Sequence, residues 1–210
     1  MGKNDSKRKL KYEFTFGNFF SALENFPDLV KGHESTLEEI RSMIETEIEK
    51  PFTEGNEEYG LIHGDLWSGN ILIPNSGWQV DKDASENTLH VIDWEFAQFS
   101  HRSTDFGQLI GDLYERKVFG NLENGVQVME GLIDGYGPLS DEMAFRTAMY
   151  VGMHLVIYYL RRPMSGPRVV SEEAIVAGLT IGRDFMVKAW AKDREFFEGS
   201  ELASLFTVAG

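Results

Sequence analysis

The spacing of hydrophobic residues along the chain changes twice, from helical to β-type and back. This feature of the sequence restricts the possible folds more than any other. Before residue 50, Leu37, Ile40, Ile44 and Ile48 recur at helical spacing. From residue 59 to about residue 93, the apolar residues fall instead in short β-type pieces, YGLIH, NILIP and TLHVI. Beyond residue 104 the helical period returns. The pattern predicts an α+β fold that is mainly helical, with a small β insert near the middle of the chain.

Local signals give boundaries to these elements. Ser35 is the predicted N-cap of the first clear helix, with Glu38 reaching back to it. Two apolar helices are expected from about 141 to 161 and from 171 to 192, the second capped by Ser171. We expect residues 1–12 to form a flexible tail and residues 13–210 a single domain. Within that domain, segment 59–115 carries the chemistry and residues 120–210 form a helical, substrate-side region.

Charge and composition exclude several classes of function. Thirty-four acidic residues against twenty Lys and Arg leave a net charge of −14, which argues against nucleic-acid binding because that needs a basic surface. The same charge suits a cationic ligand or a metal, although a solvated acidic surface is the better explanation of it. Residues 143–160 are the most hydrophobic stretch, but Arg146 and His154 interrupt it, which favours a buried helix over a membrane span. The N-terminus lacks the apolar segment of a secretory signal, so we expect a cytoplasmic protein.

The segment LIHGDLWSGNILI, residues 61–73, concentrates the polar residues of the β insert. Asp65 lies in a loop where Gly64 and Gly69 permit tight turns. Asn70 opens the next β piece, and Asp93 directly follows TLHVI. If NILIP and TLHVI pair as a hairpin, Asn70 and Asp93 meet at one end of it. Their oxygens are of the kind that Mg²⁺ prefers, while Asp65 stays free to accept a proton from a hydroxyl.

Two motifs in this region resemble those of the protein-kinase-like phosphotransferases. HGDLWSGN matches the H-G-D-x-x-x-x-N loop of the group that contains aminoglycoside phosphotransferases, choline kinases, fructosamine kinases and methylthioribose kinases. VIDWEFAQF matches the I-D-x-E segment of the same group. DLWSGN is most similar to fructosamine kinases, and EFAQFSHRSTDFGQLIGDL to methylthioribose kinase. The resemblance implies a protein-kinase-like C-terminal lobe in which a small β-hairpin insert carries the catalytic loop.

The resemblance also implies a role for each site residue. Asp65 is the expected catalytic base, and Asn70 and Asp93 are expected to bind Mg²⁺ and, through it, ATP. His63 and Asp105 are expected to brace the loop. The letters DFG occur at residues 105–107, but Asp93 follows directly from the strand after the catalytic loop, so the resemblance assigns the metal to Asp93.

Two further residues are candidate substrate contacts. Trp67 could stack on a ligand, although an aromatic lid over the core explains it equally well. Glu95 could contact a substrate or a metal, and an exposed charge is an equally good interpretation.

The residues before the catalytic loop lack the other half of such an enzyme. They contain no Gly-rich turn between strands and no strand lysine, so an N-terminal β lobe is expected to be absent from this chain. Three explanations stay open: the chain is a fragment or domain of a larger kinase, it is a natural short protein that receives the missing groups from another chain, or it is a kinase-derived lobe that uses Asp65, Asn70 and Asp93 for another task. The first hypothesis is an ATP- and Mg²⁺-dependent kinase of a small-molecule hydroxyl, with an amine-bearing substrate compatible with the acidity. The alternative is a kinase-derived lobe without phosphotransfer, which serves as a binding module or in other chemistry.

Overall fold

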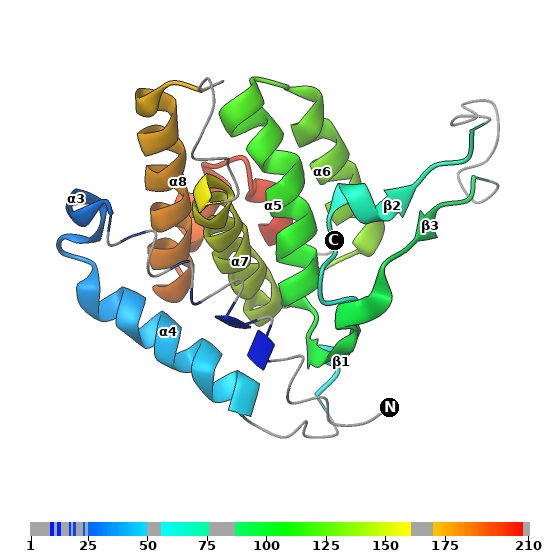
Figure 1. Cartoon of the computed structure of the whole chain (residues 1–210), viewed down its shortest axis with the longest axis horizontal. Helices are drawn as coiled ribbons and strands as arrows, with labels where there is room; N and C mark the ends of the chain where they lie inside the picture. Colours follow the sequence, from blue (N-terminus) through cyan, green and yellow to red (C-terminus); the bar gives the residue numbers. More distant parts are fainter. Residues whose placement is uncertain are drawn as a thin grey trace.

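The computed structural model of the chain is built around a group of long helices. It describes residues 9–10, 12–13, 17, 19, 23, 25–49, 56–75, 87–160 and 170–207, with the backbone alone for residues 158–160. Helix α7 lies between α5 and α8, and α6 lies against α5 (Figure 1). The helices are α3 (Pro27–Val30), α4 (Glu34–Glu49), α5 (Ser103–Gly120), α6 (Asn124–Tyr136), α7 (Asp141–Leu160), α8 (Glu172–Trp190) and α9 (Arg194–Glu198).

Several predicted helices are confirmed. Helices α7 and α8 occupy the two expected apolar segments, and the Ser171 side chain accepts the N–H of Ala174 as an N-cap. The N-cap predicted at Ser35 is wrong, because α4 already begins at Glu34. Ser35 instead lies within the first turn and donates its hydroxyl to Glu39 over 3.4 Å. The predicted tail, residues 1–12, lies largely outside the described residues, and the domain boundaries stay predictions.

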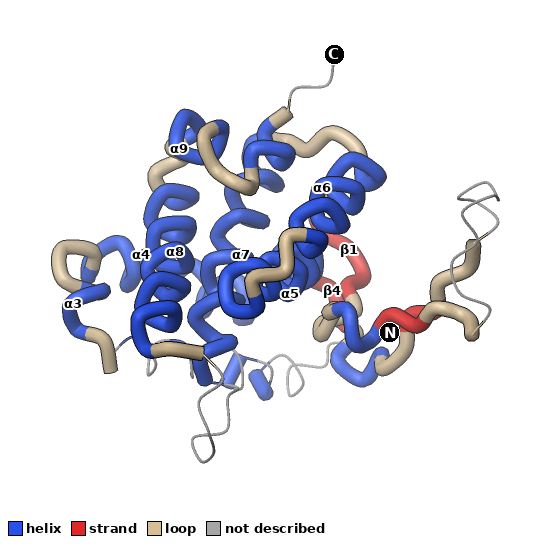
Figure 2. Tube along the Cα trace, turned by 90° about the horizontal axis from the view of Figure 1, so that it is seen from above, coloured by secondary structure: helices blue, strands red, loops and turns tan. Residues whose placement is uncertain are grey.

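Two small antiparallel sheets lie on one side of the helices, and one of them extends away from the body (Figures 1 and 2). Strand β1 (Tyr59–Ile62) pairs with β4 (Gln98–His101), a pairing that the sequence did not predict. Strand β2 (Ile71–Leu72) pairs with β3 (His90–Val91), which confirms the predicted hairpin between NILIP and TLHVI. Two short 3₁₀ helices flank the hairpin: η2 (Ser68–Asn70) forms the end of the loop before β2, and η4 (Trp94–Phe96) follows β3. A third, η5 (Ala203–Phe206), packs near α9.

Close packing on α7 fixes the position of α5. A Cβ on Gly107 of α5 would lie 2.5 Å from the Cβ of Tyr150 and 2.8 Å from the carbonyl oxygen of Thr147, so only glycine permits this approach. Phe106 and Ile110 of α5 are buried in the core, as their helical spacing predicted. The helix is therefore held rigidly while another of its sides faces the loop 63–70.

The mainly helical α+β architecture with a small β insert is confirmed. None of the helices in the described part of the chain has both the length and the apolar character that a membrane span needs.

Candidate active site

Asp105, in the first turn of α5, holds the backbone of the loop. One carboxylate oxygen accepts the N–H of Gly64 over 2.9 Å, and the other accepts the N–H of His63. Asp105 is buried, and the positive end of the helix dipole favours its negative charge there. Both oxygens of this DFG aspartate therefore face backbone donors of the loop, which is a bracing position.

His63 connects the loop to the segment before Asp93. Its Nδ1 accepts the N–H of Asp65 over 3.2 Å, so the ring proton belongs on Nε2, which donates to the carbonyl of Ile92 over 2.7 Å. The imidazole is buried, and its centroid lies 4.7 Å from that of a Trp94 ring. The neutral ring thus bonds to both segments that carry the predicted site residues.

The backbone of Asn70 brings the hairpin and the loop together. Its carbonyl accepts the N–H of Ile92 over 3.0 Å, and its side-chain Nδ2 donates to the carbonyl of Asp65 over 2.9 Å. Because the amide nitrogen of buried Asn70 is used in this way, its Oδ1 stays available as an acceptor or a ligand. Asp93 directly follows Ile92, so Asn70 and Asp93 lie at the same end of the hairpin.

Asp93 adopts an unusual backbone conformation. Its φ of 68° and ψ of 51° lie in the left-handed region, which few residues other than Gly, Asn and Asp enter. Its side chain is exposed, and no residue of the described part of the chain forms a hydrogen bond or ion pair with its carboxylate. A strained backbone with an unpaired carboxylate is typical of a functional position.

The Asp65 side chain has one partner among the described residues, and sequence reasoning missed it. The Gln108 side chain donates from Nε2 to Oδ1 of half-buried Asp65 over 2.8 Å. Gln108 lies one turn after Asp105 on α5, so a search for polar residues on the helix side of Asp105 would have found it.

Two further groups of α5 hold the loop after Asp65. Buried Asp112 accepts the N–H of Ser68 over 3.0 Å, and Arg116 donates to the Ser68 hydroxyl over 2.7 Å.

Asp112, Glu115 and His154 also have ligand atoms within 4.8 Å of one another. His154 Nε2 donates to the Glu115 carboxylate over 2.8 Å, and this pair links α5 to α7.

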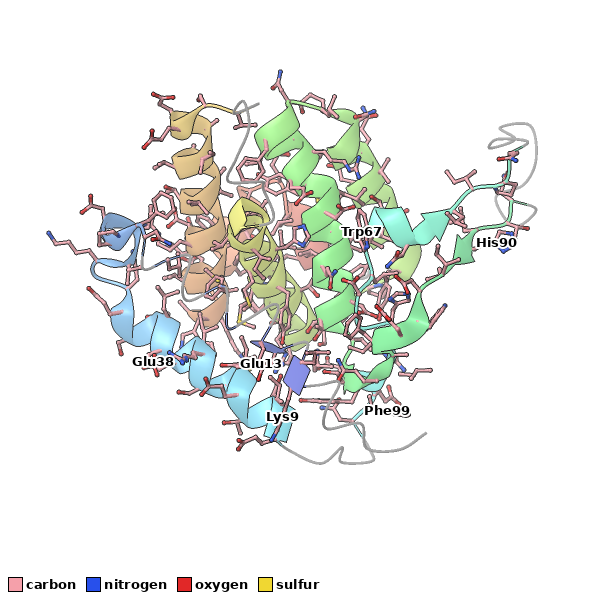
Figure 3. The ribbon with its side chains drawn as sticks, viewed as in Figure 1. Lys9, Glu13, Glu38, Trp67, His90 and Phe99 are labelled. Carbon is pink, nitrogen blue, oxygen red and sulfur yellow. The ribbon has the colours of Figure 1, made fainter. Side chains whose placement is uncertain are left out.

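The two candidate substrate contacts lie at the edge of this site. Trp67 is 38% exposed, and its indole covers Gly69, where a Cβ would lie 2.3 Å from Cη2. Figure 3 shows Trp67 beside α5, whereas His90 lies far out on the hairpin. Glu95 is exposed on η4. Both residues stay predicted substrate contacts.

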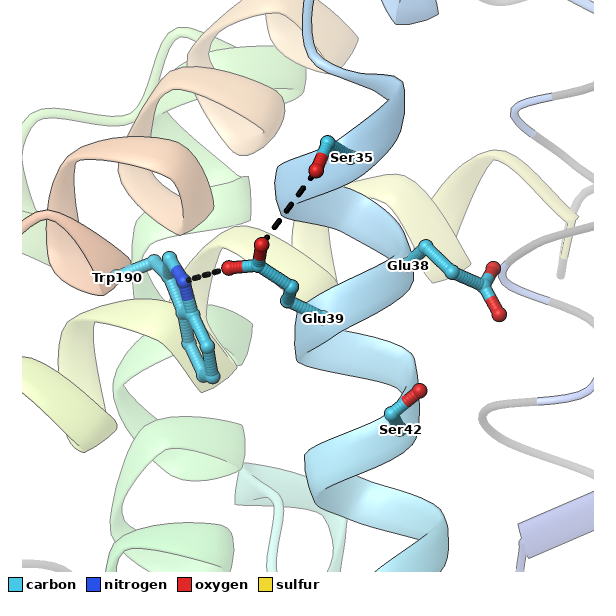
Figure 4. Close-up of a pocket in the computed structure, with 5 residues that line it drawn as sticks. All are labelled: Ser35, Glu38, Glu39, Ser42 and Trp190. Carbon is cyan, nitrogen blue, oxygen red and sulfur yellow. Dashed lines mark hydrogen bonds between the residues drawn. The ribbon is translucent and has the colours of Figure 1, made fainter.

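Two hollows elsewhere on the described surface do not include the loop. One, of about 500 Å³, is lined by Ser35, Glu38, Glu39 and Ser42 of α4 and by Trp190 of α8 (Figure 4). There Trp190 Nε1 donates to Glu39 over 2.9 Å, which ties the two helices together. The other, of about 400 Å³, lies between the end of α6 and η5. Neither of these two hollows is lined by Asp65, Asn70 or Asp93.

Comparison with known proteins agrees with this geometry. Residues 22–146 match the phosphotransferase enzyme family, which is more than half of the chain. The chain therefore belongs to this family, and the predicted resemblance to aminoglycoside phosphotransferase-like proteins is confirmed.

Fungal proteins named as a phosphotransferase and as kinases are similar to this chain. Phosphotransferase FrzJ of a Cladobotryum species is 31% identical over 194 residues, which are 92% of this chain and 48% of FrzJ. The 4-hydroxytryptamine kinases of Psilocybe cyanescens and Psilocybe cubensis are 30% and 25% identical over about half of this chain and 28% of their own length. The chain thus spans about half or less of the length of these relatives.

Proposed function

We propose that this chain carries the catalytic loop and metal ligands of a kinase that transfers the γ-phosphoryl group of ATP to a small-molecule hydroxyl. The observation that carries the proposal is the way in which Asp65 is held. Its backbone is bonded to His63 and Asn70, and its Oδ1 to Gln108. Its Oδ2 forms no hydrogen bond within the described part of the chain, so it is available to orient a hydroxyl and take its proton.

The donor set beside Asp65 fits Mg²⁺. Asn70 offers an amide oxygen and Asp93 an unpaired carboxylate, and hard oxygen ligands of this kind are what Mg²⁺ binds together with phosphate. When bound, the ion neutralises phosphate charge during transfer. His63 bonds the loop to the carbonyl of Ile92, and Asp105 bonds the loop to α5; in this proposal these bonds hold the two ligands close enough to share one ion.

We propose an acceptor that combines a hydroxyl with an amine. Two of the relatives are named as kinases of 4-hydroxytryptamine, which has both groups. A net charge of −14 attracts a cationic substrate, and in this proposal the exposed Trp67 and Glu95 contact its ring and its amine. An ATP-dependent reaction also fits the cytoplasm, the location that we propose.

We propose that a β-rich lobe, from a longer chain or a partner, covers the two small sheets. A two-stranded hairpin is marginally stable alone, and large apolar side chains gather here on the surface. Leu61 and Phe99 lie opposite each other in β1 and β4, at 50% and 40% exposure. The other exposed apolar residues on these segments are Leu72, Ile73, Leu89, Val91, Ile92 and Trp94. FrzJ contains about as much chain again as the part matched here, which is enough for such a lobe.

The test has a binding stage and a turnover stage. Calorimetry measures Mg-ATP binding to this chain and to the longest natural form of it. The test variant is Asp93→Asn, and the control variant is Asp134→Asn, which changes an exposed acid on α6. We expect Asp93→Asn to weaken Mg²⁺-dependent nucleotide binding at least tenfold and Asp134→Asn to leave it unchanged.

The turnover stage measures ADP release with 4-hydroxytryptamine, choline, a fructosamine and an aminoglycoside as acceptors. Asp65→Asn should retain nucleotide binding and lose turnover by at least a hundredfold. No nucleotide binding at millimolar ATP, or wild-type turnover in Asp65→Asn, would refute the proposal and favour the binding module.

A further inference from the structure

We infer that Gln108 is the positioning residue of Asp65, an inference that rests on the proposed function. The Gln108 amide donates to Oδ1 of Asp65 over 2.8 Å from the neighbouring helix. The Asp65 backbone is already fixed by His63 and Asn70, so the torsions of the Asp65 side chain are what remains to be set. Gln108 sets them by holding one oxygen, which presents Oδ2 to the acceptor hydroxyl.

Gln108 belongs to a polar stripe along α5 that matches the course of the loop. Asp105, Gln108, Asp112 and Arg116 are spaced three or four residues apart, which places them on one side of the helix. Asp105 bonds the start of the loop, Gln108 bonds Asp65, and Asp112 and Arg116 both bond Ser68. Among the described residues, Gln108 is the member of this stripe that contacts the side chain of the proposed base.

The chemistry of an amide suits this task. A carboxylate that acts as a base must be held in place without losing its affinity for a proton. A lysine or arginine at this distance would fix Asp65 but would also stabilise its ionised form strongly. The neutral amide of Gln108 supplies direction through a hydrogen bond and adds no charge.

The first experiment measures the contact without turnover. The ¹⁵N-labelled protein is compared with Gln108→Ala, which assigns the Gln108 side-chain NH₂ signal, and with Asp65→Asn. We expect Asp65→Asn to move this signal and to speed its exchange with solvent, because the charged acceptor is lost. A signal that stays in place overturns the inference, whatever the activity of the protein.

The second experiment measures the role in turnover, with 4-hydroxytryptamine as the acceptor probe and the longest natural form of the chain as the enzyme. Gln108→Ala should lower kcat about 10- to 100-fold while KM for Mg-ATP changes less than about twofold, because the metal ligands are untouched. The matched control is Gln127→Ala, an exposed glutamine on α6, which should keep wild-type kcat.

A pH profile separates positioning from a purely structural role. In Gln108→Glu the introduced carboxyl donates a hydrogen bond only when it is protonated. Its kcat relative to Gln108→Ala should therefore rise as pH falls from 8 to 5.5, and a constant ratio overturns the inference. Absence of ADP release from the wild-type protein with every acceptor, alongside an intact NMR contact, refutes the proposed function instead.

Discussion

Gly64 joins the catalytic loop to the segment that follows Asp93, and Gly64→Ala should break this junction. Gly64 has a φ of +85°, where a non-glycine residue costs about 1–2 kcal/mol. An added Cβ would lie 2.2 Å from the carbonyl oxygen of Phe96 in η4, so the loop must move back by roughly 1 Å to reach an ordinary contact.

That movement has a cost of its own. It stretches the 2.9 Å hydrogen bond from the Gly64 N–H to buried Asp105, and a bond to a charged acceptor contributes about 1.5–3 kcal/mol. Together the two effects lower the free energy of unfolding by about 2.5–5 kcal/mol. At about 2–4 °C per kcal/mol for a chain of this size, Tm should fall by roughly 5–20 °C.

Chemical denaturation and thermal melting measure both quantities, and Gly32→Ala is the matched control. Gly32 has nearly the same φ, +84°, but no atom lies within 4 Å of an added Cβ. It should lose about 1–2 kcal/mol from the backbone conformation alone. If Gly64→Ala is no more destabilising than Gly32→Ala, the close contact with Phe96 does not constrain the loop and the reasoning is wrong.

Three further perturbations test how the site is supported. Asp105→Ala leaves two N–H groups of the loop without their acceptor and should lower the unfolding free energy by about 2–4 kcal/mol in urea denaturation. Burial, with the nearby Arg146 cation, lowers the pKa of His101 despite its bond to Glu58, so the unfolded state binds the proton first. Stability should therefore fall as pH drops below about 6.5, and Tm measured from pH 8 to 5 should fall less in His101→Gln. Leu179→Ala opens a cavity in the fully buried core of α8 and should cost about 3 kcal/mol by the same denaturation assay.

Each of these predictions has an outcome that contradicts it. Asp134→Ala on α6 is the exposed control for Asp105→Ala, and equal stabilities would show that the bracing bonds contribute nothing. An unchanged pH dependence in His101→Gln would assign the acid sensitivity to other groups. Val176→Ala, at a residue that is 37% exposed, is the control for Leu179→Ala and should lower the unfolding free energy by under about 0.5 kcal/mol. A similar loss of stability in the two variants would show that Leu179 contributes no more than an exposed residue.

The motifs could be recognised from the sequence because their residues lie close together along the chain. The loop from His63 to Asn70 is one continuous segment, and its letters alone placed the chain in the right family. The pairing of β2 with β3 was also predictable, because the two strands are neighbours in sequence and share the β-type pattern. Helix boundaries were less secure: α4 begins one residue before the expected cap, at Glu34, whose carboxylate accepts the N–H of Gly32.

The contacts that orient the site depend on segments distant in sequence. Gln108 and Asp65 are 43 residues apart, and their hydrogen bond exists because α5 is held against α7 at Gly107. The residues of strand β4, QFSH, are mostly polar and do not predict a strand. They form one because β1 lies beside them and pairs with them. Hydrogen-bond partners of this kind follow from the packing of whole helices, which local periodicity does not encode.

The amino-acid sequence by itself determined the helical fold class, the hairpin and the identity of the oxygen-bearing side chains at the loop. The tertiary structure decided how these side chains are oriented and which groups they contact. It placed Asp105 beneath the loop, Gln108 on one oxygen of Asp65, and Asp93 in a left-handed conformation next to Asn70. The physical reason is that residue type fixes which bonds a side chain can make, whereas only the packed chain fixes which partner lies within reach.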